Sequence, residues 1–233
     1  HGVFRVVDGV TAKLRGFTVT GGSSPWGGSG IFNSGTLTLT NSTVSGNSVD
    51  FGSGGGIYNN GALTLTNSTV SGNAAYEEGA GGGIANCCIT PLDRSTLTLN
   101  NSTVSGNTAS RGGGIASGAG TLTLTNTLMD NDCTNAGGTI TSGGGNLESP
   151  GNTCGFDQGT DQPSVPDPML GPLQNNGGPT ETHALLPGSD AIDQIPEADC
   201  GVSTDQRGQP RPEPGGTLCD VGAFERQPDD PEP

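Results

Sequence analysis

The acidic residues of this sequence include one close pair, Asp130 and Asp132, which a single asparagine separates. Carboxylate oxygens are the ligands that Ca²⁺ prefers, and two carboxylates can also serve as the acid and base of glycoside hydrolysis. The two histidines are His1, at the first position, and His183, in a proline-rich segment, and neither forms part of a triad motif. We therefore expect a protein that is not an enzyme and has no cofactor, with calcium at Asp130 and Asp132 as the one metal to consider.

Six cysteines, an even number, favour an oxidising compartment and structural disulfides. Cys133 and Cys154 bracket the end of the repetitive region, and Cys200 and Cys219 bracket the segment TDQRGQPRP, so we predict these two pairs. Each bond would close a loop of about 20 residues and stabilise the fold by roughly 3 kcal/mol. A metal site is the alternative, but the sequence has no CxxC spacing and few histidines to support one.

Threonines recur at alternate positions of the TLTLT segments, in the columns Thr38/Thr64/Thr98/Thr123 and Thr40/Thr66/Thr125. Alternate side chains of a strand lie on one face, so these columns predict a flat array of hydroxyl and methyl groups, which Asn100 interrupts once. Such an array is similar to the ice-binding faces of some solenoids and to flat carbohydrate-binding faces. The simpler interpretation is that β-branched residues suit an exposed strand face, and we favour it.

Three triplets match the pattern for N-glycosylation: Asn41-Ser-Thr43, Asn67-Ser-Thr69 and Asn101-Ser-Thr103. All three occur at the same position of a repeat. An asparagine or serine there can bond to the turn backbone and to its equivalent one repeat away. We therefore predict a hydrogen-bonded ladder at these positions instead of attached glycans.

These side chains lie in a repeat whose clearest copy is GGGIYNNGALTLTNSTVSGN, from Gly54 to Asn73. Related copies run from Gly28 to Asn47, from Gly81 to Asn107 and from Gly112 to Asn131. A recurring unit of this length is typical of a solenoid, in which one repeat forms one coil. Strict alternation in TLTLT and the absence of helical periodicity predict an all-β, single-stranded parallel β-helix of about five to six coils.

We expect three short strands in each coil, with one apolar column from GGGI, two from TLTLT and one from the STVS segment. Because each inward side chain stacks on its equivalent, a few apolar residues in each coil suffice for one thin core. The predicted columns are Ile31/Ile57/Ile84/Ile115, Leu37/Leu63/Leu97/Leu122, Leu39/Leu65/Leu99/Leu124 and Val44/Val70/Val104/Leu128.

Four regions follow from these patterns. The β-helix occupies residues 1–156, a connector 157–168, a non-repetitive capping module 169–226 stapled by disulfides, and an acidic, proline-rich tail 227–233. We place the coils near 1–26, 28–53, 54–80, 81–111 and 112–156. The fourth coil contains an insertion with the adjacent Cys87 and Cys88, which we expect as a vicinal disulfide or as a crosslink to another chain.

Charge and hydropathy limit the partners and the cellular location that we expect for this protein. The formal net charge is −15, with 8 basic and 23 acidic residues, which argues against nucleic acid as a partner. No apolar run approaches the ~18 residues of a transmembrane helix, so we expect no transmembrane segment. The chain starts at His1 without a methionine, which suggests a processed or truncated N-terminus. Together with the cysteines, this favours a secreted or cell-surface protein.

The GGGI and VSGN motifs resemble the GGxI/FxxN repeats of the polymorphic outer-membrane-protein type, and this resemblance also implies a right-handed parallel β-helix. The C-terminal part is similar to the choice-of-anchor Q domain of bacterial surface proteins in three segments: 167–193, 204–212 and 219–225, which read DPMLGPLQNNGGPTETHALLPGSDAID, TDQRGQPRP and CDVGAFE. The resemblance covers nearly the whole chain up to Glu225. It implies an exported, anchored β-helix and says little about activity.

We therefore expect a non-enzymatic, extracellular structural or adhesive protein. A solenoid ends in open sheet edges, and contact between its two unlike ends would build a head-to-tail homopolymer. In this hypothesis the C-terminal module and tail of one subunit cover the first coil of the next. The alternative is a β-helix that binds or cleaves polysaccharide, with cell-surface polysaccharide as partner; a further alternative is ice binding through the threonines.

Overall fold

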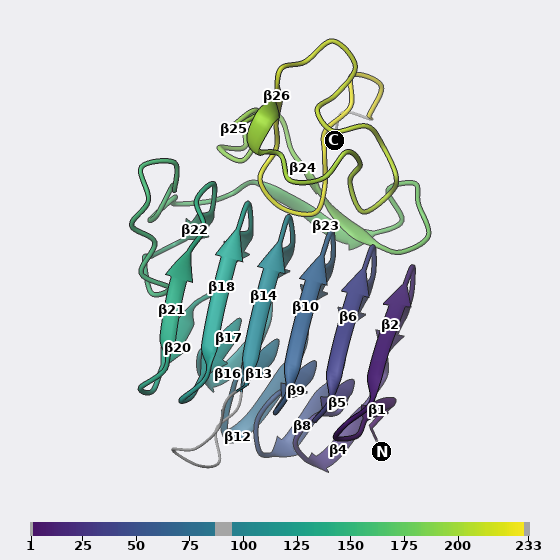
Figure 1. Cartoon of the computed structure of the whole chain (residues 1–233), viewed down its shortest axis with the longest axis vertical. Coiled ribbons are helices and arrows are strands. Elements are labelled where there is room, and N and C mark those ends of the chain that lie inside the picture. The colour runs from purple at the N-terminus through teal and green to yellow at the C-terminus, as the bar shows by residue number, and fades with distance from the viewer. Residues whose placement is uncertain (1, 87–94, 231–233) are drawn as a thin grey trace.

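The repetitive part of the chain forms a right-handed parallel β-helix of six coils, stacked from the N-terminus to the C-terminus (Figure 1). The structure, a computed structural model, describes residues 2–86 and 95–230. Strands of successive coils pair in parallel and in register, so that Leu63 lies between Leu37 and Leu97. The repeat seen in the sequence is therefore one coil of the helix.

Four sheets form the walls of the solenoid. The first sheet contains β1 (Phe4–Val6), β5 (Ile31–Asn33), β9 (Ile57–Asn59), β13 (Ile84–Asn86), β17 (Ile115–Ser117) and β20 (Cys133–Asn135). The second contains β2 (Thr11–Arg15), β6 (Thr36–Thr40), β10 (Ala62–Thr66), β14 (Thr96–Asn100), β18 (Thr121–Thr125) and β21 (Thr139–Ser142). The third contains β3 (Thr18–Thr20), β7 (Thr43–Ser45), β11 (Thr69–Ser71), β15 (Thr103–Ser105), β19 (Leu128–Asp130) and β22 (Leu147–Ser149). The fourth contains β4 (Ser23–Trp26), β8 (Ser48–Phe51), β12 (Ala74–Ala80) and β16 (Thr108–Arg111).

The fourth sheet differs from the prediction of three strands in each coil. Its strands follow the VSGN turn and have the sequences SSPW, SVDF, AAYEEGA and TASR. These segments have no common apolar pattern, and what they share is the backbone pairing that their place in the stack provides. The predicted coil 112–156 also divides into two coils, β17–β19 and β20–β22.

One thin core runs along the solenoid, and the predicted columns fill it with one exception, Leu128. The other members are almost completely buried, because each stacks on its equivalent in the next coil. The isoleucine column is Ile31, Ile57, Ile84 and Ile115, the first leucine column is Leu37, Leu63, Leu97 and Leu122, the second leucine column is Leu39, Leu65, Leu99 and Leu124, and the valine column is Val44, Val70 and Val104.

Leu128 is a correction to the valine column. It pairs with Thr103 and packs outside this core, whereas Met129 pairs with Val104 and continues the column. The fifth coil lacks the glycine of the VSGN turn, so counting back from Asn131 shifts the assignment by one residue and reverses the face.

Two ladders of asparagine amides accompany the apolar core. Asn73 Nδ2 donates to Asn107 Oδ1 at 2.9 Å, and Asn73 Oδ1 accepts from Asn47 Nδ2 at 2.9 Å. A second ladder joins Asn33, Asn59 and Asn86 at 2.7 and 2.8 Å. All of these amides are buried, so the next coil supplies the hydrogen bonds that water would otherwise provide.

The glycines of GGGI leave room for the ladder that contains Asn73. A Cβ added to Gly56 would lie 2.6 Å from the carbonyl oxygen of Gly83 and 2.9 Å from the amide carbon of Asn73. Such distances are shorter than van der Waals contact, so a side chain at this position would push two coils apart. The GGGI motif and the asparagine of VSGN are therefore two parts of one packing arrangement.

The predicted connector covers the C-terminal end of the stack. Gln162 forms a parallel bridge to Leu147 of β22, and the backbone N–H of Glu148 donates to its carbonyl at 3.0 Å. Asp161 accepts from the backbone N–H of Asn146 at 2.9 Å and from Ser142 Oγ at 2.7 Å. Residues 157–165 thus continue the third sheet locally and satisfy its last edge.

The C-terminal module lies along the flank of the solenoid instead of capping its end (Figure 1). It contains the hairpin β23 (Leu170–Gln174) and β24 (Thr182–Leu185), the short pair β25 (Ile195–Pro196) and β26 (Leu218–Cys219), and the 3-10 turn η1 (Glu197–Asp199). The side chains that it covers belong to the third sheet, whose middle strands β7, β11 and β15 are buried on both faces. The predicted capping module therefore covers the flank of the solenoid, along its third sheet.

The asparagine ladder generates a stability prediction. Asn73→Ala removes an amide with bonds to both neighbouring coils, and it takes a partner from the backbone N–H of Asn47 and from the carbonyl of Val44. We expect a loss of roughly 2–4 kcal/mol in the free energy of unfolding, measured in urea. Thr64→Ala, on the outer face of the second sheet, is the control and should change stability by less than about 0.5 kcal/mol. Equal effects of the two substitutions would contradict a role for the ladder.

Candidate functional site

The predicted core columns do not form a functional site. They were predicted as core ladders, and apart from Leu128 they pack in the main core. Members of the two leucine columns and of the valine column have no exposed surface, so a ligand cannot touch them: Leu65, Leu99, Leu122, Leu124 and Val70. None of the column residues lines the surface hollows found in the described part of the chain. Any site must therefore lie outside these core columns.

The two predicted disulfides are present in the structure. Cys133–Cys154 closes the C-terminal end of the main core beside Phe156, and Cys200–Cys219 joins β26 to the turn after η1 within the core of the module. The buried carboxylate of Glu148 accepts hydrogen bonds from Thr153 and from the backbone N–H of Cys154, and so holds the first bridge in place. Cys87 and Cys88 lie outside the described residues.

The pair Asp130 and Asp132 is not assembled as a metal site. Asp130 Oδ2 accepts from Ser105 Oγ at 2.7 Å, whereas Asp132 Oδ1 accepts from the backbone N–H of Gly113 at 2.6 Å. Burial raises the pKa of Asp130, and its bond to Ser105 opposes this rise. Within residues 2–86 and 95–230, no group of three or more His, Cys, Asp or Glu side chains is placed to share a metal ion. Each carboxylate instead has its own structural contact.

Gln206 is the residue that joins the module to the third sheet. Its Oε1 accepts from Thr69 Oγ1 at 2.8 Å, and its Nε2 donates to Thr43 Oγ1 at 2.9 Å and to Thr180 Oγ1 at 2.8 Å. The side chain is completely buried. One amide thus bridges two coils and a second segment of the module, a role that its position in TDQRGQPRP does not reveal.

His183 contacts the solenoid in a similar way. Its Nδ1 lies 2.7 Å from the carbonyl oxygen of Gly171, which can only accept, so Nδ1 carries the proton and Nε2 accepts from Ser71 Oγ at 2.8 Å. Burial lowers the pKa of His183 and favours this neutral form. The orientation is that of a base beside a nucleophile. Ser71 is only 5% exposed between the third sheet and the hairpin, however, so the pair serves docking and not attack on a substrate.

In the NST triplets the serines form the predicted ladder between coils, whereas Asn67 and Asn101 bond to the C-terminal module. The serines form the ladder: the backbone N–H of Ser42 donates to Ser68 Oγ at 3.2 Å, and that of Ser68 to Ser102 Oγ at 3.3 Å. Asn67 Nδ2 instead donates to the carbonyl of Thr204 at 2.7 Å, and Asn101 Nδ2 to that of Cys200 at 2.9 Å. A glycan on either asparagine would require the module to leave the sheet.

Buried charges hold the module together. Arg207 pairs with Asp205 at 2.9 Å and with Asp230 at 2.8 Å and stacks on Phe224, with 3.7 Å between its guanidinium carbon and the ring centroid. Arg211 pairs with Glu225 at 3.0 Å. Asp230 belongs to the predicted tail, so the tail is bound by its own module over the residues that the structure describes. This contact removes the reason for assigning the tail to a neighbouring subunit.

Two further acidic residues of the module, Asp220 and Asp193, differ in how deeply their side chains are buried. Burial raises the pKa of Asp220 to about 6, although its carboxylate accepts backbone hydrogen bonds from Arg226 and Asp193. The side chain of Asp193 is exposed and contributes only this backbone group. The carboxylate of Asp193 therefore takes no part in the described ion pairs of Arg207 and Arg211.

The threonine columns of the second sheet are in register, as predicted, and Asn100 stands between Thr66 and Thr125. This face carries no charge from β6 to β21, and its only basic residues, Lys13 and Arg15, lie on β2. The side chains in the middle column are half-buried and form no hollow. The face is a regular wall of the solenoid.

A different surface has the form of a binding site. We call it the aromatic corner and define it as Trp26, Phe32, Phe51 and Tyr58 with Arg5. Trp26 pairs in register with Phe51 in the fourth sheet, and Phe32 pairs with both Arg5 and Tyr58 in the first sheet. The end of a fourth-sheet strand leads directly into the first sheet of the next coil, so aromatic residues from both sheets meet at this edge.

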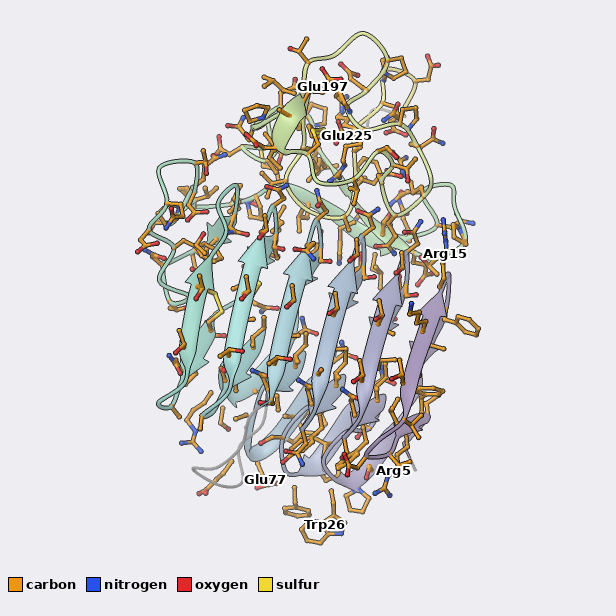
Figure 2. The ribbon with its side chains drawn as sticks, in the orientation of Figure 1. Arg5, Arg15, Trp26, Glu77, Glu197 and Glu225 are labelled. Carbon is orange, nitrogen blue, oxygen red and sulfur yellow. A yellow bond between two sulfur atoms is a disulfide. The ribbon has the colours of Figure 1, made fainter. Side chains whose placement is uncertain are left out.

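The aromatic corner lines an open hollow of about 590 Å³. The ring centroids of Trp26 and Phe51 lie 6.2 Å apart, and the rings of Phe32 and Tyr58 stack at 5.2 Å with 9° between their planes. Trp26 is 72% exposed and Phe51 54% exposed. Figure 2 shows Trp26 and Arg5 at the edge of the solenoid opposite the C-terminal module, which is marked by Glu197 and Glu225.

Two glycines keep the floor of the hollow low. A Cβ on Gly27 would lie 2.9 Å from the carbonyl oxygen of Ser53, and a Cβ on Gly52, where φ is +139°, would lie 3.0 Å from the backbone N of Gly27. The sequence contains a signal that we did not use: Trp26-Gly27 and Phe51-Gly52 occupy equivalent positions of successive repeats. Large exposed aromatic residues at matching positions indicate a surface that is used for binding.

Comparison with known proteins adds no family. No family model, characterised protein or solved structure matches this chain. The similarity to choice-of-anchor Q domains and to polymorphic outer-membrane-protein repeats therefore stays at the level of motifs. In the described part of the chain, no helix is long and apolar enough to cross a membrane.

The docking geometry predicts the effect of changing Gln206. In Gln206→Leu the hydroxyls of Thr43 and Thr69 lose their shared amide partner while the apolar volume is kept. We expect the module to open more often, with a stability loss of roughly 2–4 kcal/mol and faster proteolysis between residues 157 and 168. Gln209→Leu, an exposed position in the same loop, is the matched control. Unchanged proteolysis of Gln206→Leu would contradict this role.

Proposed function

We propose that this protein is an extracellular adhesive solenoid that binds polysaccharide at the aromatic corner without chemically changing it. The observation that carries the proposal is the pair of exposed rings, Trp26 and Phe51, over a hollow with glycines in its floor. Sugar rings present apolar C–H faces that exposed aromatic rings can cover, while the surrounding hydroxyls stay in water. An extended ligand suits a hollow that is open to solvent.

Several features support binding and not catalysis. Among the residues that the structure describes, the lining of the hollow contains one charged side chain, Arg5, and no carboxylate that could act as an acid or base. The buried Ser71–His183 pair instead joins the module to the third sheet. Two disulfides and a covered third sheet give a rigid support, and preorganised surfaces lose little entropy on binding. The disulfides also fit the extracellular location that the proposal includes.

Glycan binding is tested with Trp26→Ala and Phe51→Ala on a glycan array, followed by calorimetry with the polysaccharides that bind. Burial of one large aromatic side chain contributes about 1.5–3 kcal/mol, so each variant should weaken binding by roughly tenfold or more. Phe17→Ala is the matched control, because Phe17 is 53% exposed but lies outside the hollow. If no glycan binds the native protein, or if all three variants bind alike, the proposal is wrong.

Head-to-tail self-association is the second candidate, and a charge polarity favours it. The first coil contains Arg5, Lys13 and Arg15 against one acid, Asp8, whereas residues 130–168 contain six acids and no base. Stacking copies along the axis would bring these opposite charges together. The part of this hypothesis that used the C-terminal module as an end cap loses its support, because the module lies on the flank.

Sedimentation velocity and electron microscopy test self-association. We expect rods that lengthen with protein concentration at low salt and shorten at 1 M salt, where the Debye length falls to about 3 Å. The double substitution Lys13→Glu with Arg15→Glu should abolish the rods, and Arg111→Glu, on β16, serves as the control. Monomers at high concentration and low salt would reject the hypothesis.

A further inference from the structure

We infer that the polysaccharides bound at the aromatic corner carry carboxylate groups, as uronic acids do, and that Arg5 binds these carboxylates. The inference rests on the proposed function and adds the chemical class of the ligand. It starts from the position of Arg5, which is exposed on β1 at the rim of the hollow.

The guanidinium of Arg5 lies with its flat face over an aromatic ring, and its N–H edge forms no ion pair with the described residues. Its central carbon lies 5.0 Å from the centroid of the Phe32 ring, which itself stacks on Tyr58. A cation over an aromatic face keeps its in-plane N–H groups available, and these groups match the two oxygens of a carboxylate. The stacked rings thus orient Arg5 before a ligand arrives.

Arg207 shows how this chain completes such an arrangement. It also stacks its guanidinium on an aromatic ring, that of Phe224, and its edge is occupied by the carboxylates of Asp205 and Asp230 at 2.9 and 2.8 Å. Arg5 forms no ion pair in the part of the chain that the structure describes. Because the guanidinium of Arg5 is solvated, leaving its N–H groups without an ion pair costs little free energy. These N–H groups stay available as donors to a carboxylate from outside the chain.

The charge around the aromatic corner has the sign that this ligand requires. Residues 1–76 carry three basic residues and two acidic ones, so the excess negative charge of the protein begins at Glu77. An acidic polysaccharide is therefore not repelled at this end of the solenoid as it would be at the other. Glu77 and Glu78 lie on β12 and Asp50 lies on β8, all within the fourth sheet, but none of them lines the hollow.

A uronate fits both parts of the site. Its pyranose ring supplies the apolar face for Trp26 or Phe51, and its carboxylate, attached to the same ring, supplies the partner for Arg5. A simple anion would use only Arg5, and a neutral sugar would use only the rings. The combination of one oriented cation with exposed aromatic rings in one hollow favours a ligand that has both features.

The experiment compares alginate, polygalacturonate and hyaluronan, each beside its carboxyl-reduced neutral form, by calorimetry and affinity electrophoresis on the intact protein. We expect at least one acidic form to bind about tenfold more tightly than its reduced form. Arg5→Gln should remove this difference, because it should weaken binding of the acidic form far more than binding of the reduced form. Trp26→Ala should weaken both forms.

Lys13→Gln is the matched control, because it removes one positive charge from the same coil outside the hollow. If it lowers the preference for the acidic form as much as Arg5→Gln does, general electrostatics explain the preference and Arg5 has no specific role. If polysaccharides bind but no acidic form is preferred, the inference is overturned while the proposed function stands. If neither form of any polysaccharide binds, and the glycan array is also negative, both fail.

Discussion

A buried amide must have hydrogen-bond partners, and in this solenoid each asparagine amide finds one in the equivalent residue of the next coil. That constraint sets the register of the whole stack. It keeps the strands of adjacent coils in register, and it requires glycine at the positions where the backbone of the next coil approaches closely. The apolar columns alone could slide or rotate with little loss, because methyl groups are not directional. The amides are directional, and they make the coils equivalent.

Equivalence of the coils gives each wall its own surface. On the second sheet it produces rows of threonine, and at the edge between the fourth and first sheets it stacks Phe32 on Tyr58 and places Trp26 beside Phe51. The third sheet has hydroxyl rows that would be exposed in a bare solenoid. The C-terminal module covers them and uses the same regularity, because Gln206 bridges Thr43 and Thr69, which are one coil apart. In the proposed function, support and binding are thereby separated. The module and the disulfides stabilise one flank and the C-terminal end, while the opposite edge keeps large aromatic side chains in water.

Much of the fold follows from the sequence because a repeated coil has a repeated environment. The alternation in TLTLT determines which leucines point inward, so that Leu65 and Leu99 are assigned to the core correctly, and the recurrence of GGGI and VSGN determines the coil. The spacing of the cysteines also identifies both disulfides. Where the repeat loses a residue, as before Asn131, the same logic assigns the wrong face to Leu128 and misses Met129.

Only the tertiary structure shows which non-repetitive segments contact which coils. Nothing in TDQRGQPRP or in the segment around His183 reveals that they pack against Thr69 and Ser71, since these contacts join residues more than a hundred positions apart. The aromatic corner is only partly visible in the sequence, which places Trp26 and Phe51 at equivalent repeat positions. The turn after the fourth-sheet strand brings Trp26 and Arg5 to one hollow, and the sequence does not show this. The sequence by itself determined the coil and its inward columns, because alternation along a strand is local. The tertiary structure decided which wall is covered and which edge keeps its aromatic side chains exposed, because that depends on where a chain without repeats packs.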